Sequence, residues 1–201
     1  MSTWLALIVE TNGRPDFWEV AAKHHIGPAA SGVPARALIE CPWVANADLP
    51  LVLAEALSRE LGSTALGFAA QTTADVYRLH AFTRGARVRK LDYSRDEGGW
   101  LAIEGTPQPW EPAFFFDPGG STTDDGAAWP DMLDDELTDE KIAAYESARA
   151  KGDPGPVMRH LSPSSTMPLI RICEWYGLAG DAPHGRVGKP RSIFARLFGR
   201  G

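Results

Sequence analysis

The sequence predicts an α+β fold: an antiparallel β-meander with a packed helix, C-terminal helices and a short amphipathic tail. Two patterns indicate this class. Strand-like segments follow one another from residue 64 to residue 104, and an amphipathic helical segment over residues 49–61 directly precedes them. Adjacent strands beside a segregated helix are typical of α+β proteins rather than of doubly wound sheets. Hydrophobic residues make up 44% of the 201-residue chain and charged residues 23%, which is typical of a globular protein.

The first fifty residues hold two strand candidates and one helix candidate. The short apolar run over residues 4–10 predicts a buried strand. A proline suited to a first helical turn, followed by apolar residues at helical spacing, predicts a helix over residues 15–24. Residues 35–41 form the second strand candidate, which ends at Pro42.

The segment 49–61 carries the strongest helix signal in the chain. Asp48 precedes it as an N-cap and Pro50 lies just inside it. Leucine and alanine recur at helical spacing, and Gly62 follows as a C-terminal stop.

The meander consists of strand candidates separated by turn sequences rich in Gly, Asp and Thr. These candidates are residues 64–71, 76–83, 87–93 and 100–104. Three prolines and four aromatic residues lie within residues 107–116. We expect this stiff aromatic segment to cross and seal one edge of the sheet.

The rest of the chain divides by composition. Residues 117–137 are acidic and contain no Lys or Arg, which indicates a linker or loop. Thr138 suits the N-cap of a helix that ends near Ala150, and residues 167–176 predict a last helix. The expected organisation is an α+β core domain (1–116), an acidic linker (117–137), C-terminal helices packed on the core (138–178), and a Gly/Pro linker with a basic tail (179–201).

Charge is unevenly distributed along the chain. The net charge is −6, yet the residues from Gly185 onward include five basic and no acidic ones, so the rest carries −11. An acidic body lacks the basic footprint that nucleic acids require, so we expect no nucleic-acid binding. The absence of a signal peptide pattern and of an apolar run of about 18 residues predicts a soluble, cytoplasmic protein.

The C-terminal tail carries the main functional prediction. On a helix, Ile193, Phe194, Leu197 and Phe198 cluster on one side, and basic residues including Arg196 lie on the other. Such a segment suits the hydrophobic groove of a protein partner. Its apolar area is too small for firm membrane anchoring, so contact with a membrane surface is the weaker alternative. Packing of the tail on its own domain and an unstructured terminus stay open.

A basic hairpin forms the second candidate surface. Arg84, Arg87, Arg89 and Lys90 place four cations within seven residues at the turn between two predicted strands. They suit an anionic ligand or an acidic partner. Two other interpretations stay open: these charges protect an exposed edge strand, or they pair with the protein's own acidic residues.

Motifs for cofactors, metals or nucleophilic catalysis are not recognisable. His24 and His25 are adjacent and diverge on a helix, so they do not share a metal ion easily. We therefore expect no metal and no cofactor. His80 is predicted to lie opposite Arg89 or Lys90 across the hairpin, so a site for general acid–base catalysis remains an alternative.

These patterns favour a non-catalytic, adaptor-like protein–protein interaction module that docks through its C-terminal tail. One alternative is an inhibitor or immunity-type protein whose acidic surface neutralises a basic partner. The other is a small enzyme of unknown reaction with its site at the meander. A pocket lined by His80, Arg78 and Trp100 would favour the enzyme, whereas an exposed apolar patch would favour the binding module. The pattern does not indicate an oligomeric state.

Overall fold

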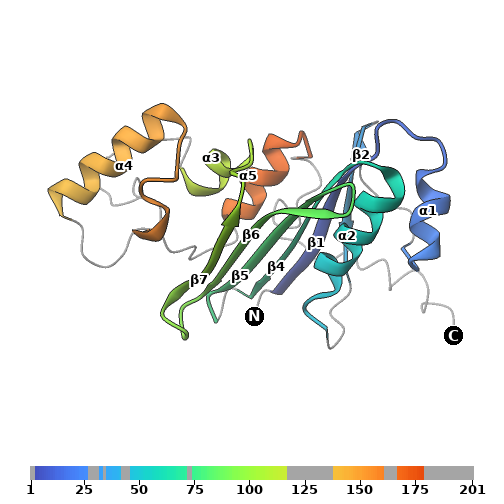
Figure 1. Ribbon diagram of the computed structural model, residues 1–201, viewed down its shortest axis with the longest axis horizontal. Coiled ribbons are helices and arrows are strands. Elements are labelled where there is room, and N and C mark those ends of the chain that lie inside the picture. Colours follow the sequence, from blue (N-terminus) through green and yellow to red (C-terminus); the bar gives the residue numbers. More distant parts are fainter. Residues whose placement is uncertain are drawn as a thin grey trace, which may run out of the picture.

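A computed structural model describes residues 3–26, 32–33, 35–41, 46–71, 74–116, 138–160 and 167–178. Within these ranges the strands are β1 (Thr3–Glu10), β2 (Gly32–Val33), β3 (Arg36–Glu40), β4 (Thr64–Gln71), β5 (Val76–Thr83), β6 (Ala86–Ser94) and β7 (Gly99–Gly105). They form one antiparallel sheet (Figure 1), in which the strand order is β2-β3-β1-β4-β5-β6-β7. The predicted meander is therefore its β4–β7 half, and β1 extends it by pairing with β4.

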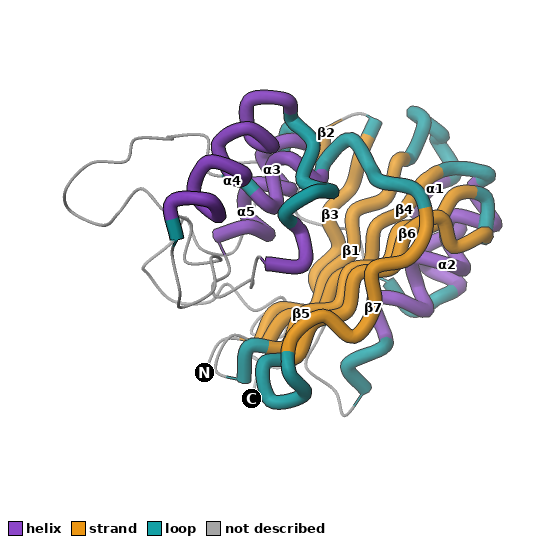
Figure 2. Tube along the Cα trace, turned by 60° about the vertical axis from the view of Figure 1, so that its left-hand side comes forward, coloured by secondary structure: helices purple, strands orange, loops and turns teal. Residues whose placement is uncertain are grey.

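The described helices lie on both faces of this sheet. They are α1 (Phe17–Lys23), α2 (Leu49–Leu61), α3 (Glu111–Phe115), α4 (Asp139–Lys151) and α5 (Met167–Trp175), with a 3₁₀ turn at Met158–His160. Figure 2 shows the sheet between two groups of helices, α1 and α2 on one side and α3, α4 and α5 on the other. The α+β class is thus confirmed. No helix among the described residues is long and apolar enough to cross a membrane.

Strand β1 explains why its sequence shows an apolar run without alternation. Leu7 and Val9 pack in the core beneath α1 and α2, whereas Ala6 and Ile8 belong to the core beneath the other helices. Because successive side chains of a strand point to opposite faces, a strand covered on both faces must be apolar at nearly every position.

Helix α2 has the bounds predicted from its sequence, and Gly62 ends it in the left-handed conformation with φ +63°. Its first turn lies very close to β4. A Cβ atom on Gly67 would be 2.5 Å from the carbonyl oxygen of Pro50, so only glycine permits this approach. Asp48 does not cap the helix with its side chain and instead pairs with Arg78.

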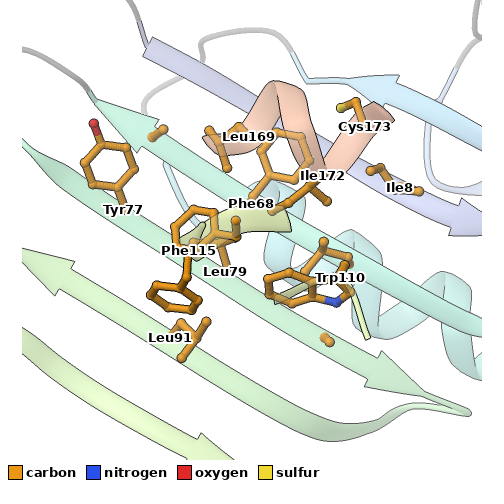
Figure 3. Packing of buried hydrophobic residues seen from close by; sticks show 14 of the residues in the cluster. Ile8, Phe68, Tyr77, Leu79, Leu91, Trp110, Phe115, Leu169, Ile172 and Cys173 are labelled. Carbon is orange, nitrogen blue, oxygen red and sulfur yellow. The ribbon is translucent and has the colours of Figure 1, made fainter. Parts of the chain in front are cut away.

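The second core is aromatic and lies between the other face of the sheet and helices α3 and α5. Phe68, Leu79 and Leu91 of the strands meet Trp110 and Phe115 there (Figure 3). The segment 107–116 therefore packs on a face of the sheet, and the expectation that it seals an edge is corrected. Burial of its aromatic side chains favours this position because it removes a large apolar area from water.

The C-terminal helices contribute to the same core. Tyr145 and Ala148 of α4 and Leu169 and Ile172 of α5 are buried in it. Thr138 caps α4, since its hydroxyl accepts a hydrogen bond from the backbone N–H of Lys141. The acidic segment 117–137 and the tail 189–201 lie outside the described residues.

Candidate functional site

A groove opens between α2 and the β5–β6 half of the sheet. Helix α2 packs on β4, β1 and β5, and side chains of α2, β5 and β6 line the groove. The groove has a volume of about 290 Å³. Its lining residues are Asp48, Leu51, Val52, Glu55, Arg78, His80, Phe82, Gly85 and Arg87. We call it the α2 groove.

A histidine–carboxylate pair is formed by His80, which lines the α2 groove, and Asp92. His80 Nε2 is 2.8 Å from Asp92 Oδ1, and the two side chains are only 7% and 11% exposed. His80 lies directly opposite Lys90 in the β5–β6 ladder, which confirms one of the two predicted positions, and Arg78 lies opposite Asp92. The pair therefore spans a diagonal between neighbouring strands.

Three basic side chains surround the carboxylate of Asp92. Besides the histidine, Lys90 Nζ lies 3.4 Å from Oδ2 and Arg78 Nε lies 3.6 Å from Oδ1. Burial would raise the pKa of Asp92, but the hydrogen bond from His80 and these positive charges outweigh it. The pKa is held below its usual value, so Asp92 is a carboxylate near neutral pH.

Two further carboxylates, those of Asp48 and Glu104, extend this network. Arg78 also pairs with Asp48, and Glu104 lies 3.6 Å from Arg87 and 3.8 Å from Lys90. Every Arg and Lys named here thus has a carboxylate within 4.0 Å. The charges of this groove are compensated internally.

A second groove lies among α3, α4 and α5, on the opposite face of the sheet. It has a volume of about 330 Å³ and is lined by Pro112, Ala113, Phe116, Arg149, Arg171, Glu174 and Trp175. We call it the C-terminal groove. Trp175 is 44% exposed, and Arg171 Nη1 donates a hydrogen bond to the carbonyl oxygen of Phe116 at 3.3 Å. Within the described ranges, neither Arg149 nor Arg171 has a carboxylate partner.

The four basic residues predicted at the hairpin do not form one patch. Arg84 is exposed at the turn, and Arg87 lies at the α2 groove. Lys90 lies on the same face, beside Asp92. Arg89 points to the opposite face, where it is 4% exposed. Strand β6 is internal to the sheet, so the edge-protection interpretation is wrong.

Arg89 is instead one half of a buried ion pair. Its Nε and Nη2 atoms donate to the two carboxylate oxygens of Glu111, both at 2.8 Å. Its Nη1 donates to the carbonyl oxygens of Glu104 and Gly105 at 3.3 and 3.0 Å. This fully bonded guanidinium fastens α3 to the sheet and is inaccessible to a partner.

Several site residues were not expected from the sequence. Asp92 could have been found, because the pairs Arg78/His80 and Lys90/Asp92 alternate along strands joined by the predicted turn at Arg84. For Arg149, Arg171 and Trp175 no local pattern exists. The predicted tail residues Ile193, Phe194, Arg196, Leu197 and Phe198 lie outside the described residues.

Comparisons of the chain with models of protein families, with curated proteins and with solved structures found no match. In the described part of the chain, no group of three or more His, Cys, Asp or Glu residues is placed to hold a metal ion.

Proposed function

We propose that the protein is a protein-binding module that docks an acidic, partly apolar segment of another protein in its C-terminal groove. The observation that carries this proposal is the exposed ring of Trp175 beside Arg149 and Arg171, which lack carboxylate partners in the described residues. Tryptophan and arginine are the residues that most often dominate the binding energy of protein interfaces.

Charge complementarity supports an acidic occupant. The whole chain has a net charge of −6, yet this groove brings together two arginines that have no carboxylate partner among the described residues. Glu174 also lines the groove but forms no ion pair with them among the described residues. A carboxylate from a partner would accept hydrogen bonds from a guanidinium, and Trp175, Phe116 and Pro112 would contact an apolar side chain.

The α2 groove gives less support to the inhibitor or immunity-type alternative. A basic partner would need carboxylates that are free to pair. Of the groove's acids, Asp48 pairs with Arg78 and Glu55 pairs with Arg59, and Asp92 below them is surrounded by cations. Docking of the tail on a partner stays part of the proposal and is independent of the C-terminal groove.

The test measures fluorescence anisotropy of a labelled peptide of alternating glutamate and leucine residues titrated with the full chain. We expect saturable binding, and we expect Arg149→Glu with Arg171→Glu to weaken it about tenfold or more. Trp175→Ala should weaken it as well. A lysine–leucine peptide of the same length controls for nonspecific hydrophobic binding and should not bind.

Matched variants separate the groove from the general surface. Arg159→Glu changes an exposed arginine that does not line the groove, and Trp18→Ala removes an exposed tryptophan on α1. Both should keep the affinity within about twofold. Equal binding by the double charge-reversal variant and the unaltered protein would overturn the assignment of the C-terminal groove.

A further inference from the structure

We propose that the α2 groove is an acid–base site in which His80, oriented by Asp92, removes a proton from water that attacks a small, uncharged carboxylic ester. This activity is separate from partner binding, because the two grooves lie on opposite faces of the sheet. It rests on a buried histidine–carboxylate pair whose histidine lines an open groove.

The pair fixes which nitrogen of His80 can act. A carboxylate accepts hydrogen bonds only, so the neutral ring carries its proton on Nε2, which donates to Asp92 at 2.8 Å. The lone pair is then on Nδ1, which has no hydrogen-bond partner among the described residues. A carboxylate that holds the tautomer and orientation of an imidazole is the arrangement general-base catalysis requires.

The walls of the groove define the class of substrate. Leu51, Val52 and Phe82 supply apolar surface, and a volume of about 290 Å³ suits a small molecule. A charged substrate would have to displace the existing ion pairs, so an uncharged ester fits better. The half-buried guanidinium of Arg78 lines the same groove and would stabilise negative charge that develops on the carbonyl oxygen.

The chemical step balances without a cofactor. His80 Nδ1 takes a proton from water while the water oxygen forms a bond to the carbonyl carbon. The bond between that carbon and the alkoxy oxygen then breaks, and the proton passes from Nδ1 to the leaving oxygen. The products are a carboxylic acid and an alcohol, and the imidazole returns to its neutral form.

The first test follows steady-state hydrolysis of p-nitrophenyl acetate in large excess over the protein. Acylation of lysines would consume only a fixed amount of ester per protein molecule, so continued turnover excludes it. His80→Gln should lose about tenfold or more of the protein-dependent rate. His24→Gln is the matched control: His24 Nε2 is 2.7 Å from Glu60 Oε1, but that pair is more exposed and lies outside the groove. It should keep its rate within about twofold of the unaltered protein.

A second pair of variants avoids the core. Val52→Trp adds bulk at an exposed position of α2 that lines the groove, and it should lower the rate by blocking access. Leu101→Trp makes a similar change at an exposed position of β7 outside the groove and should have no effect.

Asp92→Asn tests the positioning role through the pH–rate profile. Without the carboxylate, the remaining cations favour the neutral imidazole, so the acid limb of the profile should move to lower pH while the maximum falls. The charged groups around His80 are Lys90, Asp92 and Arg87 on β6, Arg78 on β5, and Asp48 and Glu55 on α2. The proposal is overturned if the unaltered protein hydrolyses the ester no faster than His80→Gln does. It is also overturned if Asp92→Asn has the same pH–rate profile as the unaltered protein. In either case the pair is a structural part of the ion network.

Discussion

The α2 groove and the C-terminal groove hold their positive charges differently. In the first, Arg78, Arg87 and Lys90 all pair with carboxylates of the protein itself. In the second, Arg149 and Arg171 have no such partner in the described residues and lie beside an exposed tryptophan. A compensated network stabilises a fixed arrangement, whereas uncompensated guanidinium groups gain most from a carboxylate supplied by another molecule. The two grooves of this acidic chain therefore lead to different proposals, an acid–base site for the first and docking of a partner for the second.

The buried pair Arg89–Glu111 beneath α3 should show the largest effect on stability. Glu111→Ala leaves a guanidinium that is 4% exposed without its carboxylate, so the free energy of unfolding should fall by about 3–5 kcal/mol. The matched control is Glu104→Ala, which removes an exposed carboxylate of β7 that pairs with Arg87 and should cost less than about 1 kcal/mol. Urea unfolding measures both.

A double variant identifies the cause of that loss. Arg89→Met with Glu111→Leu removes both charges, so it should recover most of the stability lost in Glu111→Ala. Failure to recover would mean that the hydrogen bonds lost in the double variant outweigh the removal of the uncompensated charge. These are the bonds from Arg89 to the carbonyl oxygens of Glu104 and Gly105 and the bond from the backbone N–H of Gln108 to Glu111.

The apolar packing beneath the α2 groove comes next. Leu57 is completely buried between α2 and the sheet, and Leu57→Ala should lower the free energy of unfolding by about 2–5 kcal/mol. Val52→Ala, on the exposed side of the same helix, should change it by less than about 0.5 kcal/mol. A loss below about 1 kcal/mol for Leu57→Ala would contradict the packing of α2 on this face.

The ion network around Asp92 predicts that the free energy of unfolding depends on pH. Asp92→Asn should cost about 1.5–3 kcal/mol near pH 7, because it removes a buried charged acceptor. The pKa of Asp92 is depressed in the folded state, so its contribution to the free energy of unfolding is fully present above the unfolded-state pKa of about 3.9. This contribution is lost as the pH falls through the pKa of the folded state. The difference between the two proteins in urea unfolding should therefore shrink in acid, and a constant difference would contradict the network.

Local signals in the sequence were enough for the elements of the fold. The bounds of α2, β4 and β5 agree with the prediction, because caps, turn residues and spacing act over a few neighbouring positions. Helix α3 was not expected, since Pro112 and three phenylalanines give a weak helix signal that burial in the aromatic core overrides.

The sites depended on contacts that the sequence does not display. If side chains simply alternated along β6, Arg87 and Arg89 would lie on the same face of the sheet. A bulge shifts the register between Ala81 and Phe82, so Arg87 faces the α2 groove while Arg89 enters the aromatic core. The C-terminal groove combines residues from three helices that are distant in sequence, and its charge balance depends on which carboxylates those helices bring near.

The smallest effect on stability is expected for the tail, and the comparison of the two grooves gives the reason. Arg149 and Arg171 would repel the basic residues of the tail, and the carboxylates of the α2 groove already have partners. Neither described groove is complementary to it, which favours docking on another protein. Phe194→Ala with Phe198→Ala should therefore leave the thermal midpoint nearly unchanged, within the range of surface substitutions of about 0.5 kcal/mol.

The same variant, and a chain truncated after Gly188, should lose a partner captured by the full chain in a chemical cross-linking pull-down. A midpoint several degrees lower would instead mean that the tail packs on its own domain, and unchanged stability with unchanged capture would remove the tail from the binding surface.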